Sequence, residues 1–439
     1  MKKILVLGAG LVSRPLMHYL LDVPEFEVIV ATRTVQKAEH LLEGHPRGKA
    51  MPLNVENQAE LAKLVRECDL SISLLPYIHH LKVANLCLEY RKPMVTTSYI
   101  SPAMQALNEQ ARQAGVLLLN EIGVDPGIDH MSAMRIIHAV EKAGGKVVSF
   151  KSYCGGLPAP EANTNPFGYK FSWSPRGVLM AGRNDAKYLE NGKIVEIPGH
   201  DLFKHHWPLE VEGMQFETYP NRNSLPYIET YGLKNVHTMF RGTIRNIGWC
   251  DALYCIAKLG LLSDAPRTDL AGLTFDGLTR LLTNAQGGET TQRALWRFLG
   301  SDANEKVLSM LEWLGLTSHE ALPKTDPTLL DVMTARFLEK MSYAEGERDM
   351  IVLYHEFITE YPDKREKITS TLVDFGIPHG DSSMARTVSL PAAIATKLIL
   401  QGKINLTGVL APVMPEIYNP VLDELETLNI TCKEQTFPL

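Results

Sequence analysis

Two glycines near the N-terminus stand where a nucleotide phosphate can bind. The apolar run 4–7 leads directly into Gly8 and Gly10, and Ser13 follows. A strand that turns tightly into a helix holds a pyrophosphate at the helix N-terminus. Gly8 permits the turn, Gly10 lets the backbone approach the phosphates, and Ser13 is small enough for close helix packing. The sequence predicts a dinucleotide site, with an ordinary strand–turn–helix as the alternative.

Arg33 and Thr34 follow the second predicted strand, residues 27–31. Sites for NAD usually place an acid at this point to bind the ribose 2′-hydroxyl, whereas an arginine suits a 2′-phosphate. A solvated charge at a strand end is the alternative. The pattern favours NADP over NAD.

Polar residues also follow two later strands. Ser98 and Tyr99 come after the predicted strand 93–96, and Asp125 comes after the strand 116–119. The carboxyl ends of strands line the ligand crevice of an open α/β sheet. Asp125 precedes the helix that leaves the first domain, where it can bond a substrate ammonium or relay a proton, or serve as a charge at the helix N-terminus.

Two arginine-bearing segments lie later in the chain. Arg222 stands within residues 219–224, and Arg241 and Arg245 stand within residues 240–245. Paired guanidinium N–H groups are the usual way to hold a carboxylate, so together these segments indicate an anionic substrate. Surface charge is the alternative for each arginine singly.

Neither histidine pair predicts a metal site. His79-His80 and His205-His206 have no carboxylate or thiol at ligand spacing, so we expect no metal ligands. Cys154 directly follows the predicted strand 146–153 and precedes a glycine pair. A thiol nucleophile needs a base beside it, and none is visible locally.

The elements that position these residues alternate between strand and helix. The predicted strands of the first part are 3–7, 27–31, 50–53, 70–75, 93–96 and 116–119. Their nearly continuous hydrophobicity is typical of strands covered on both faces, which favours a parallel, doubly wound sheet. Asn57 with Glu60, and Ser101 with Pro102, are typical helix starts.

The rest of the chain is more varied. A helix over 128–143 and a strand over 146–153 precede an irregular segment, 154–168, which is either a wall of the site or a surface excursion. The predicted elements after residue 264 are helices 276–282, 290–299, 303–314 and 328–341, the strand 349–357 and the helix 390–400, which ends before Gly402. The helices between residues 264 and 341 indicate a small all-helical insertion.

Composition excludes several classes of protein. The chain has 439 residues, 45% of them hydrophobic and 21% charged, which predicts two or three ordinary globular domains. Its net charge of −6, without a basic block, argues against a nucleic-acid partner. No apolar run approaches the roughly 18 residues of a membrane span. The N-terminus resembles no signal peptide, and six scattered cysteines indicate a reducing, cytoplasmic setting.

Taken together, these residues resemble the saccharopine reductase family, the NADP-dependent, glutamate-forming saccharopine dehydrogenases. The resemblance covers nearly the whole chain. Its most specific stretches are 96–102, 120–130, 153–161, 168–174, 219–224 and 241–245, and the tail segment 402–412 also matches. The segment 195–217 and the helical insertion match only loosely. The resemblance implies interconversion of saccharopine with L-glutamate and 2-aminoadipate 6-semialdehyde through an imine.

The resemblance also implies an architecture. A Rossmann-type domain, 1–125, is completed by a C-terminal segment, 386–439, that packs back onto it. A second α/β domain with a mixed sheet, 126–263 and 342–385, binds substrate and forms a homodimer. A small helical domain occupies 264–341.

Site residues follow from the same resemblance. Saccharopine is expected to contact Ser98, Tyr99, Asp125, Arg222, Thr243 and Arg245. Proton transfer is expected from Asp125, Tyr99, Cys154 or a bound water. NADP is expected to contact Gly8, Gly10, Leu11, Val12, Ser13, Arg33, Thr34, Asn54, Val55, Leu75, Thr97, Ser98, Val124, Asp125, Pro126 and Ser174. Asn54 stands where the family more often has Asp, and either side chain can hydrogen-bond near the adenosine.

Two other functions compete with this hypothesis. An imine-reducing dehydrogenase of polyamine synthesis, of the carboxynorspermidine or homospermidine type, shares the dinucleotide domain but is expected to lack one arginine cluster. A non-catalytic NADP-binding protein would keep the glycine turn but has no need of Arg222, Arg245 and Asp125, which this chain retains.

Overall fold

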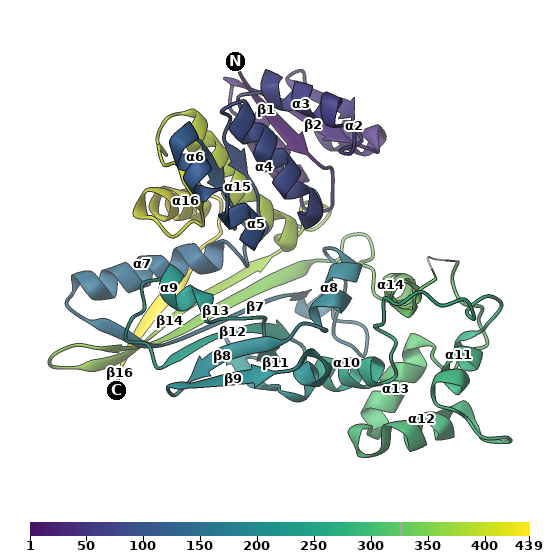
Figure 1. Cartoon of the computed structure of the whole chain (residues 1–439). Coiled ribbons are helices and arrows are strands. Elements are labelled where there is room, and N and C mark those ends of the chain that lie inside the picture. The colour runs from purple at the N-terminus through teal and green to yellow at the C-terminus, as the bar shows by residue number, and fades with distance from the viewer. Residues whose placement is uncertain (325–326) are drawn as a thin grey trace. The chain divides into compact units, whose positions relative to one another are not determined.

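The computed structural model describes residues 1–324 and 327–439, which form two compact units (Figure 1). Unit 1 comprises Met1–Lys146, Thr359–Arg365 and Leu372–Leu439, and unit 2 comprises Val147–Ile358 and Glu366–Thr371. The helix that begins at Ile128 belongs to unit 1, whereas the sequence places a domain boundary near residue 125. The four-part division of the chain stays a prediction.

Unit 1 contains a seven-stranded parallel sheet in the order β15-β6-β5-β4-β1-β2-β3. Its strands are β1 (Lys2–Leu7), β2 (Phe26–Thr32), β3 (Gly48–Pro52), β4 (Leu70–Ser73), β5 (Met94–Val95), β6 (Leu117–Leu119) and β15 (Gly408–Leu410). The order 3-2-1-4-5-6 is that of a dinucleotide-binding doubly wound fold. The predicted Rossmann-type sheet is confirmed, and β15 extends it beside β6.

The core of unit 1 consists of apolar residues from the strands of this sheet and from helices packed on it. The helices of unit 1 are α1 (Arg14–Leu21), α2 (Val35–Leu42), α3 (Gln58–Glu67), α4 (His80–Glu89), α5 (Pro102–Gln105), α6 (Asn108–Ala114), α7 (Ile128–Lys142), α15 (Ser383–Leu400) and α16 (Pro415–Thr427), with the 3₁₀ turn η1 (Tyr77–His79). In Figure 1 the yellow-green α15 and α16 belong to the same unit as the purple N-terminal elements.

A mixed sheet of nine strands forms the second α/β part. Its strands are β7 (Lys146–Pro158), β8 (Ala186–Glu190), β9 (Lys193–Ile197), β10 (Trp207–Val211), β11 (Met214–Pro220), β12 (Thr238–Arg245), β13 (Asp349–Glu360), β14 (Arg365–Phe375) and β16 (Lys433–Pro438). The path runs β10-β11-β12-β7-β13-β14-β16, with the β8–β9 hairpin attached at β12. β12 and β7 are parallel, while β11 and β12 are antiparallel.

The helices of unit 2 include the predicted helical insertion. They are α8 (Pro175–Ala181), α9 (Pro226–Thr230), α10 (Trp249–Lys258), α11 (Phe275–Leu282), α12 (Thr291–Leu299), α13 (Glu305–Leu314) and α14 (Leu329–Lys340), with 3₁₀ turns η2 (Pro160–Ala162), η3 (Gly199–Lys204) and η4 (Gly300–Asp302). Between residues 264 and 341, the described part holds helices and isolated bridges but no named strand. No helix in the described ranges is both long and apolar enough to cross a membrane.

Two predicted element boundaries are wrong by five residues or more. The sequence predicts a strand that ends at Tyr153, but β7 continues to Pro158. Gly155 lies so close to β12 that an added Cβ would come within 2.5 Å of the Ile244 carbonyl oxygen, so this glycine permits the pairing instead of ending the strand. The helix predicted from residue 390 begins at Ser383, where the Ser382 hydroxyl accepts a hydrogen bond from Ala385 N at 3.0 Å.

Candidate active site

The glycine turn has the geometry that the sequence predicts. Gly8 has φ +110°, and a Cβ there would lie 3.1 Å from the Leu74 carbonyl oxygen. A Cβ on Gly10 would meet nothing within 4 Å, so the backbone is open on this side. Ser13 is buried at the start of α1, and its hydroxyl donates to the Gly10 carbonyl at 2.7 Å. The turn thus presents exposed backbone at a helix N-terminus, which suits a phosphate.

Except for Ser174 in unit 2 and the two residues of the glycine turn, the other residues expected to contact NADP follow the ends of parallel strands. Arg33 and Thr34 are exposed after β2, and exposed Asn54 follows β3. The Asn54 side chain accepts a hydrogen bond from Glu56 N at 3.1 Å, which fixes this turn. Leu11 and Val12 lie in the glycine turn, Val55 follows Asn54, Leu75 follows β4, Thr97 and Ser98 follow β5, and Val124, Asp125 and Pro126 follow β6. Parallel strands bring these positions to one edge of the sheet.

Ser98 is held by a histidine whose role the sequence does not reveal. His80 Nε2 lies 2.8 Å from Ser98 Oγ, and its Nδ1 lies 2.8 Å from Ser73 Oγ. Burial lowers the pKa of His80 to about 4, so the ring is neutral at pH 7. A neutral imidazole donates through one nitrogen and accepts through the other, so it fixes both hydroxyl orientations.

Tyr99 and Asp125 come together in unit 1. The Tyr99 hydroxyl donates a hydrogen bond to Asp125 Oδ1 at 3.2 Å, and both side chains are partly exposed. Asp125 lies outside α7, which begins at Ile128 with Gly127 as its N-cap and Asp129 as its first-turn acid. Asp125 lies two residues before the N-cap of α7, so it is not in the first turn of that helix, and its predicted roles toward the substrate stay predictions.

Three predicted site residues of unit 2 lie on adjacent strands. Cys154 on β7 is the register partner of Thr243 on β12, and Arg245 lies two residues further along β12. The Arg245 guanidinium is buried, with its carbon 4.9 Å from the Tyr169 ring centroid and 5.6 Å from that of Trp249. Its Nε has no hydrogen-bond partner among the described residues. A buried cationic donor of this kind favours an anion nearby.

Of the other predicted residues of unit 2, Arg222 and Ser174 are exposed and Arg241 is buried. Arg222 follows β11, is exposed and has φ +54°. Arg241, from the second arginine segment, is buried and stacks 4.4 Å from the Tyr227 ring centroid, which is a structural contact. Ser174 is exposed, and its hydroxyl caps α8 by accepting from Gly177 N at 3.2 Å.

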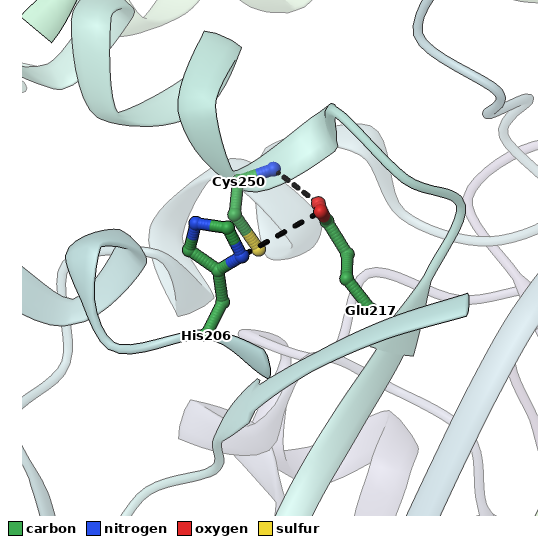
Figure 2. Close-up of side chains that lie close together, drawn as sticks. All are labelled: His206, Glu217 and Cys250. Carbon is green, nitrogen blue, oxygen red and sulfur yellow. Dashed lines mark hydrogen bonds and ion pairs between the residues drawn. The ribbon is translucent and has the colours of Figure 1, made fainter. Parts of the chain in front are cut away.

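A histidine, a carboxylate and a thiol also meet in unit 2 (Figure 2). The ligand atoms of His206, Glu217 and Cys250 lie within 4.8 Å of one another. Glu217 accepts from Gly248 N at 3.0 Å and from Cys250 N at 2.6 Å, so it caps the N-terminus of α10. His206 Nδ1 lies 3.6 Å from Glu217, and its Nε2 lies 3.2 Å from Asp251. These contacts explain the group without a cation, and the absence of metal ligands stays a prediction.

Family models match both parts of the chain. The saccharopine dehydrogenase NADP binding domain matches residues 4–119, and the saccharopine dehydrogenase C-terminal domain matches residues 123–430. A solved structure, apo histidine-tagged saccharopine dehydrogenase (L-Glu forming) from Saccharomyces cerevisiae, is 40% identical with a TM-score of 0.90, and the match covers 100% of both chains. The fold is therefore that of this yeast protein.

Similar sequences agree with these matches. The saccharopine dehydrogenase [NADP(+), L-glutamate-forming] of Schizosaccharomyces pombe is 42% identical over 447 residues, covering 99% of each chain. The mitochondrial alpha-aminoadipic semialdehyde synthase of Bos taurus is 39% identical, and the match covers 99% of this chain but 48% of that protein. The chain belongs to the saccharopine dehydrogenase family.

Proposed function

We propose that this protein is an NADP-dependent oxidoreductase that interconverts saccharopine with L-glutamate and 2-aminoadipate 6-semialdehyde. The observation that carries the proposal is the 42% identity, over 99% of both chains, to a fungal protein named for this activity. The parallel sheet with its open glycine turn, and the buried Arg245, support the same assignment.

NADP is proposed to bind at the carboxyl edge of the parallel sheet. Gly8, Gly10 and the N-terminus of α1 hold the pyrophosphate, and Arg33 with Thr34 holds the 2′-phosphate. Exposure of Arg33 and Thr34 directly after β2 supports this role. The remaining predicted cofactor contacts, including Ser174, keep the roles given by the family resemblance.

Arginines are proposed to bind the carboxylates of saccharopine. Saccharopine carries three carboxylates, which guanidinium groups bind through paired N–H donors. Arg222 offers an exposed guanidinium, and Arg245 offers a buried one beside Thr243. Ser98, Tyr99 and Asp125 are proposed to contact the amine part of the substrate, since carboxylate and hydroxyl oxygens accept hydrogen bonds from ammonium groups.

When bound, NADP would accept or supply the hydride at the carbon–nitrogen bond; water would add to the imine in one direction and be lost as the imine forms in the other. The protein's own task is to orient the substrate and move protons. Asp125, Tyr99 and Cys154 are proposed for proton transfer, with a bound water as a further carrier. The 3.2 Å hydrogen bond from Tyr99 to Asp125 supports a pair that can share a proton with the substrate nitrogen.

We also propose that the enzyme acts as a homodimer in the cytoplasm, without a nucleic-acid partner. None of the six cysteines is assigned to a disulfide, which is typical of a reducing compartment. The net charge of −6 disfavours a polyanionic partner. Sedimentation of the purified protein at several concentrations tests the dimer.

A spectrophotometric assay tests the reaction. NADPH absorbance is followed with 2-aminoadipate 6-semialdehyde and L-glutamate added singly and together. The proposal predicts NADPH oxidation only when both are present. Tight NADPH binding without oxidation would instead indicate a non-catalytic binding protein.

A further inference from the structure

Glu121 holds the peptide groups on both sides of Tyr99. Its backbone N–H donates to the Ser98 carbonyl oxygen at 3.1 Å, and its Oε1 accepts from Ile100 N at 2.8 Å. Ser98 and Ile100 are the chain neighbours of Tyr99. One residue therefore fixes the backbone from which the Tyr99 ring projects.

The backbone of Glu121 indicates that its side chain is needed at this position. Glu121 has φ +57°, a left-handed conformation that glycine adopts freely and that other L-residues seldom adopt. The side chain is also buried, with 5% of the residue exposed. A glycine would remove both the strain and the buried charge, but it could not reach Ile100 N. The contacts of the carboxylate account for a glutamate here.

The second carboxylate oxygen of Glu121 contacts a residue of α7. Glu121 Oε2 lies 2.8 Å from Nε2 of His130, which is fully buried. His130 Nδ1 lies 3.7 Å from Asp129 Oδ1, and this oxygen accepts from Gly127 N at 2.5 Å. Gly127 lies two residues after Asp125. The contacts of Glu121 through His130 and Asp129 thus extend to the loop that carries Asp125, the hydrogen-bond partner of Tyr99.

We propose that Glu121, oriented by His130, is a positioning residue that aligns Tyr99 with Asp125 for the reaction. This inference rests on the proposed function, because it assigns Tyr99 and Asp125 to the substrate. Glu121 itself does not contact saccharopine; it acts by fixing where the Tyr99 hydroxyl points. A small displacement of an aligned group can lower a rate about 100-fold.

Two substitutions separate this role from folding. Glu121→Gly relieves the left-handed strain and removes the carboxylate, so it should fold, with kcat lowered about 10- to 100-fold. Glu121→Gln keeps an oxygen for Ile100 N but loses the charge facing His130, so its kcat should be intermediate. Binding of NADPH should stay within about 3-fold of the parent in both. Glu141→Gln, at an exposed position of α7, is the matched control and should leave kcat unchanged.

A double-mutant cycle with Tyr99→Phe decides whether Glu121 acts through Tyr99. If it does, Glu121→Gly should lower kcat by less than about 3-fold in the Tyr99→Phe background, because the aligned hydroxyl is already gone. An equal loss in both backgrounds would overturn the inference, as would an unchanged kcat in Tyr99→Phe alone. An inactive parent overturns the proposed function together with this inference, whereas an active parent with equal losses overturns the inference alone.

Discussion

The hydroxyl of Tyr99 donates a 3.2 Å hydrogen bond to Asp125, although 26 residues separate them in the chain. They follow β5 and β6, which are adjacent parallel strands. The parallel order alone brings the two residues to one edge of the sheet, and the hydrogen bond fixes their orientation. We regard this pair as the centre of proton handling.

Asp125→Asn tests this assignment. The amide keeps the shape of the side chain but cannot accept a proton, so kcat should fall about 10²- to 10⁴-fold. Kd for NADPH, measured by fluorescence, should change little. Asp69→Asn is a matched control that should keep full activity. Asp69 is partly exposed, directly precedes β4 and accepts a hydrogen bond from Lys3 N of β1. Full activity in Asp125→Asn would show that another group carries the proton.

Arg222→Ala tests carboxylate binding. Loss of an exposed guanidinium that pairs with a substrate carboxylate should raise KM for the amino-acid substrates about 10-fold or more, and leave NADPH binding unchanged. Arg293→Ala, at an exposed position of α12, serves as the control in steady-state kinetics. A collapse of NADPH affinity instead would show that Arg222 has been assigned to the wrong ligand.

Arg33→Ala tests the cofactor preference. Arg33 is proposed to bind the 2′-phosphate. Its removal should lower the preference for NADPH, measured as kcat/KM with NADPH divided by kcat/KM with NADH, by about 10-fold or more. The loss should appear with NADPH and not with NADH. Lys63→Ala, at an exposed position of α3, controls for the loss of a surface cation. With an unchanged ratio, some other residue must read the 2′-phosphate.

His80 predicts a pH dependence of stability. Burial lowers the pKa of His80 to about 4, below the usual 6.5, so the unfolded chain binds a proton more readily than the folded one as the pH falls below about 6.5. The free energy of unfolding should therefore fall between pH 7 and pH 5, by about 2 kcal/mol from this group. Urea unfolding of the whole protein, compared at pH 7 and pH 5, measures this loss in the free energy of unfolding.

His80→Gln is the comparison for that measurement. Glutamine can hydrogen-bond one of the two hydroxyls but does not titrate, so the loss of stability between pH 7 and pH 5 should be smaller by about the same 2 kcal/mol. Identical pH dependence in both proteins would mean that His80 does not titrate as its burial predicts.

Local features of the fold were predictable from sequence because neighbouring residues determine them. The Asn57 side chain accepts from Glu60 N at 3.3 Å, and the Ser101 hydroxyl accepts from Met104 N at 3.1 Å, so both predicted helix starts are confirmed. Continuous apolar runs predicted the buried strands of unit 1. The positive φ of Gly8 confirms the predicted turn.

Other features depend on contacts between distant segments. β7 passes through Gly155, since burial against Ile244 outweighs the low strand preference of glycine. His206 has no carboxylate beside it in sequence, yet in the fold it lies close to Glu217 of β11 and Asp251 of α10. Glu121 and His130 lie in the stretch 120–130 that resembles the family, but the sequence gives them no role. Only the folded chain shows that Glu121 bonds to the neighbour of Tyr99 and to His130.

Transfer of deuterium from NADPH that carries deuterium at both C4 positions of the nicotinamide tests the central claim most directly. With L-glutamate and 2-aminoadipate 6-semialdehyde, mass spectrometry should detect saccharopine that carries one deuterium, on the carbon that was the aldehyde, because that carbon of the imine receives the hydride from NADPH. Unlabelled saccharopine, a deuterated alcohol of the semialdehyde, or a labelled product formed without glutamate would contradict the claim.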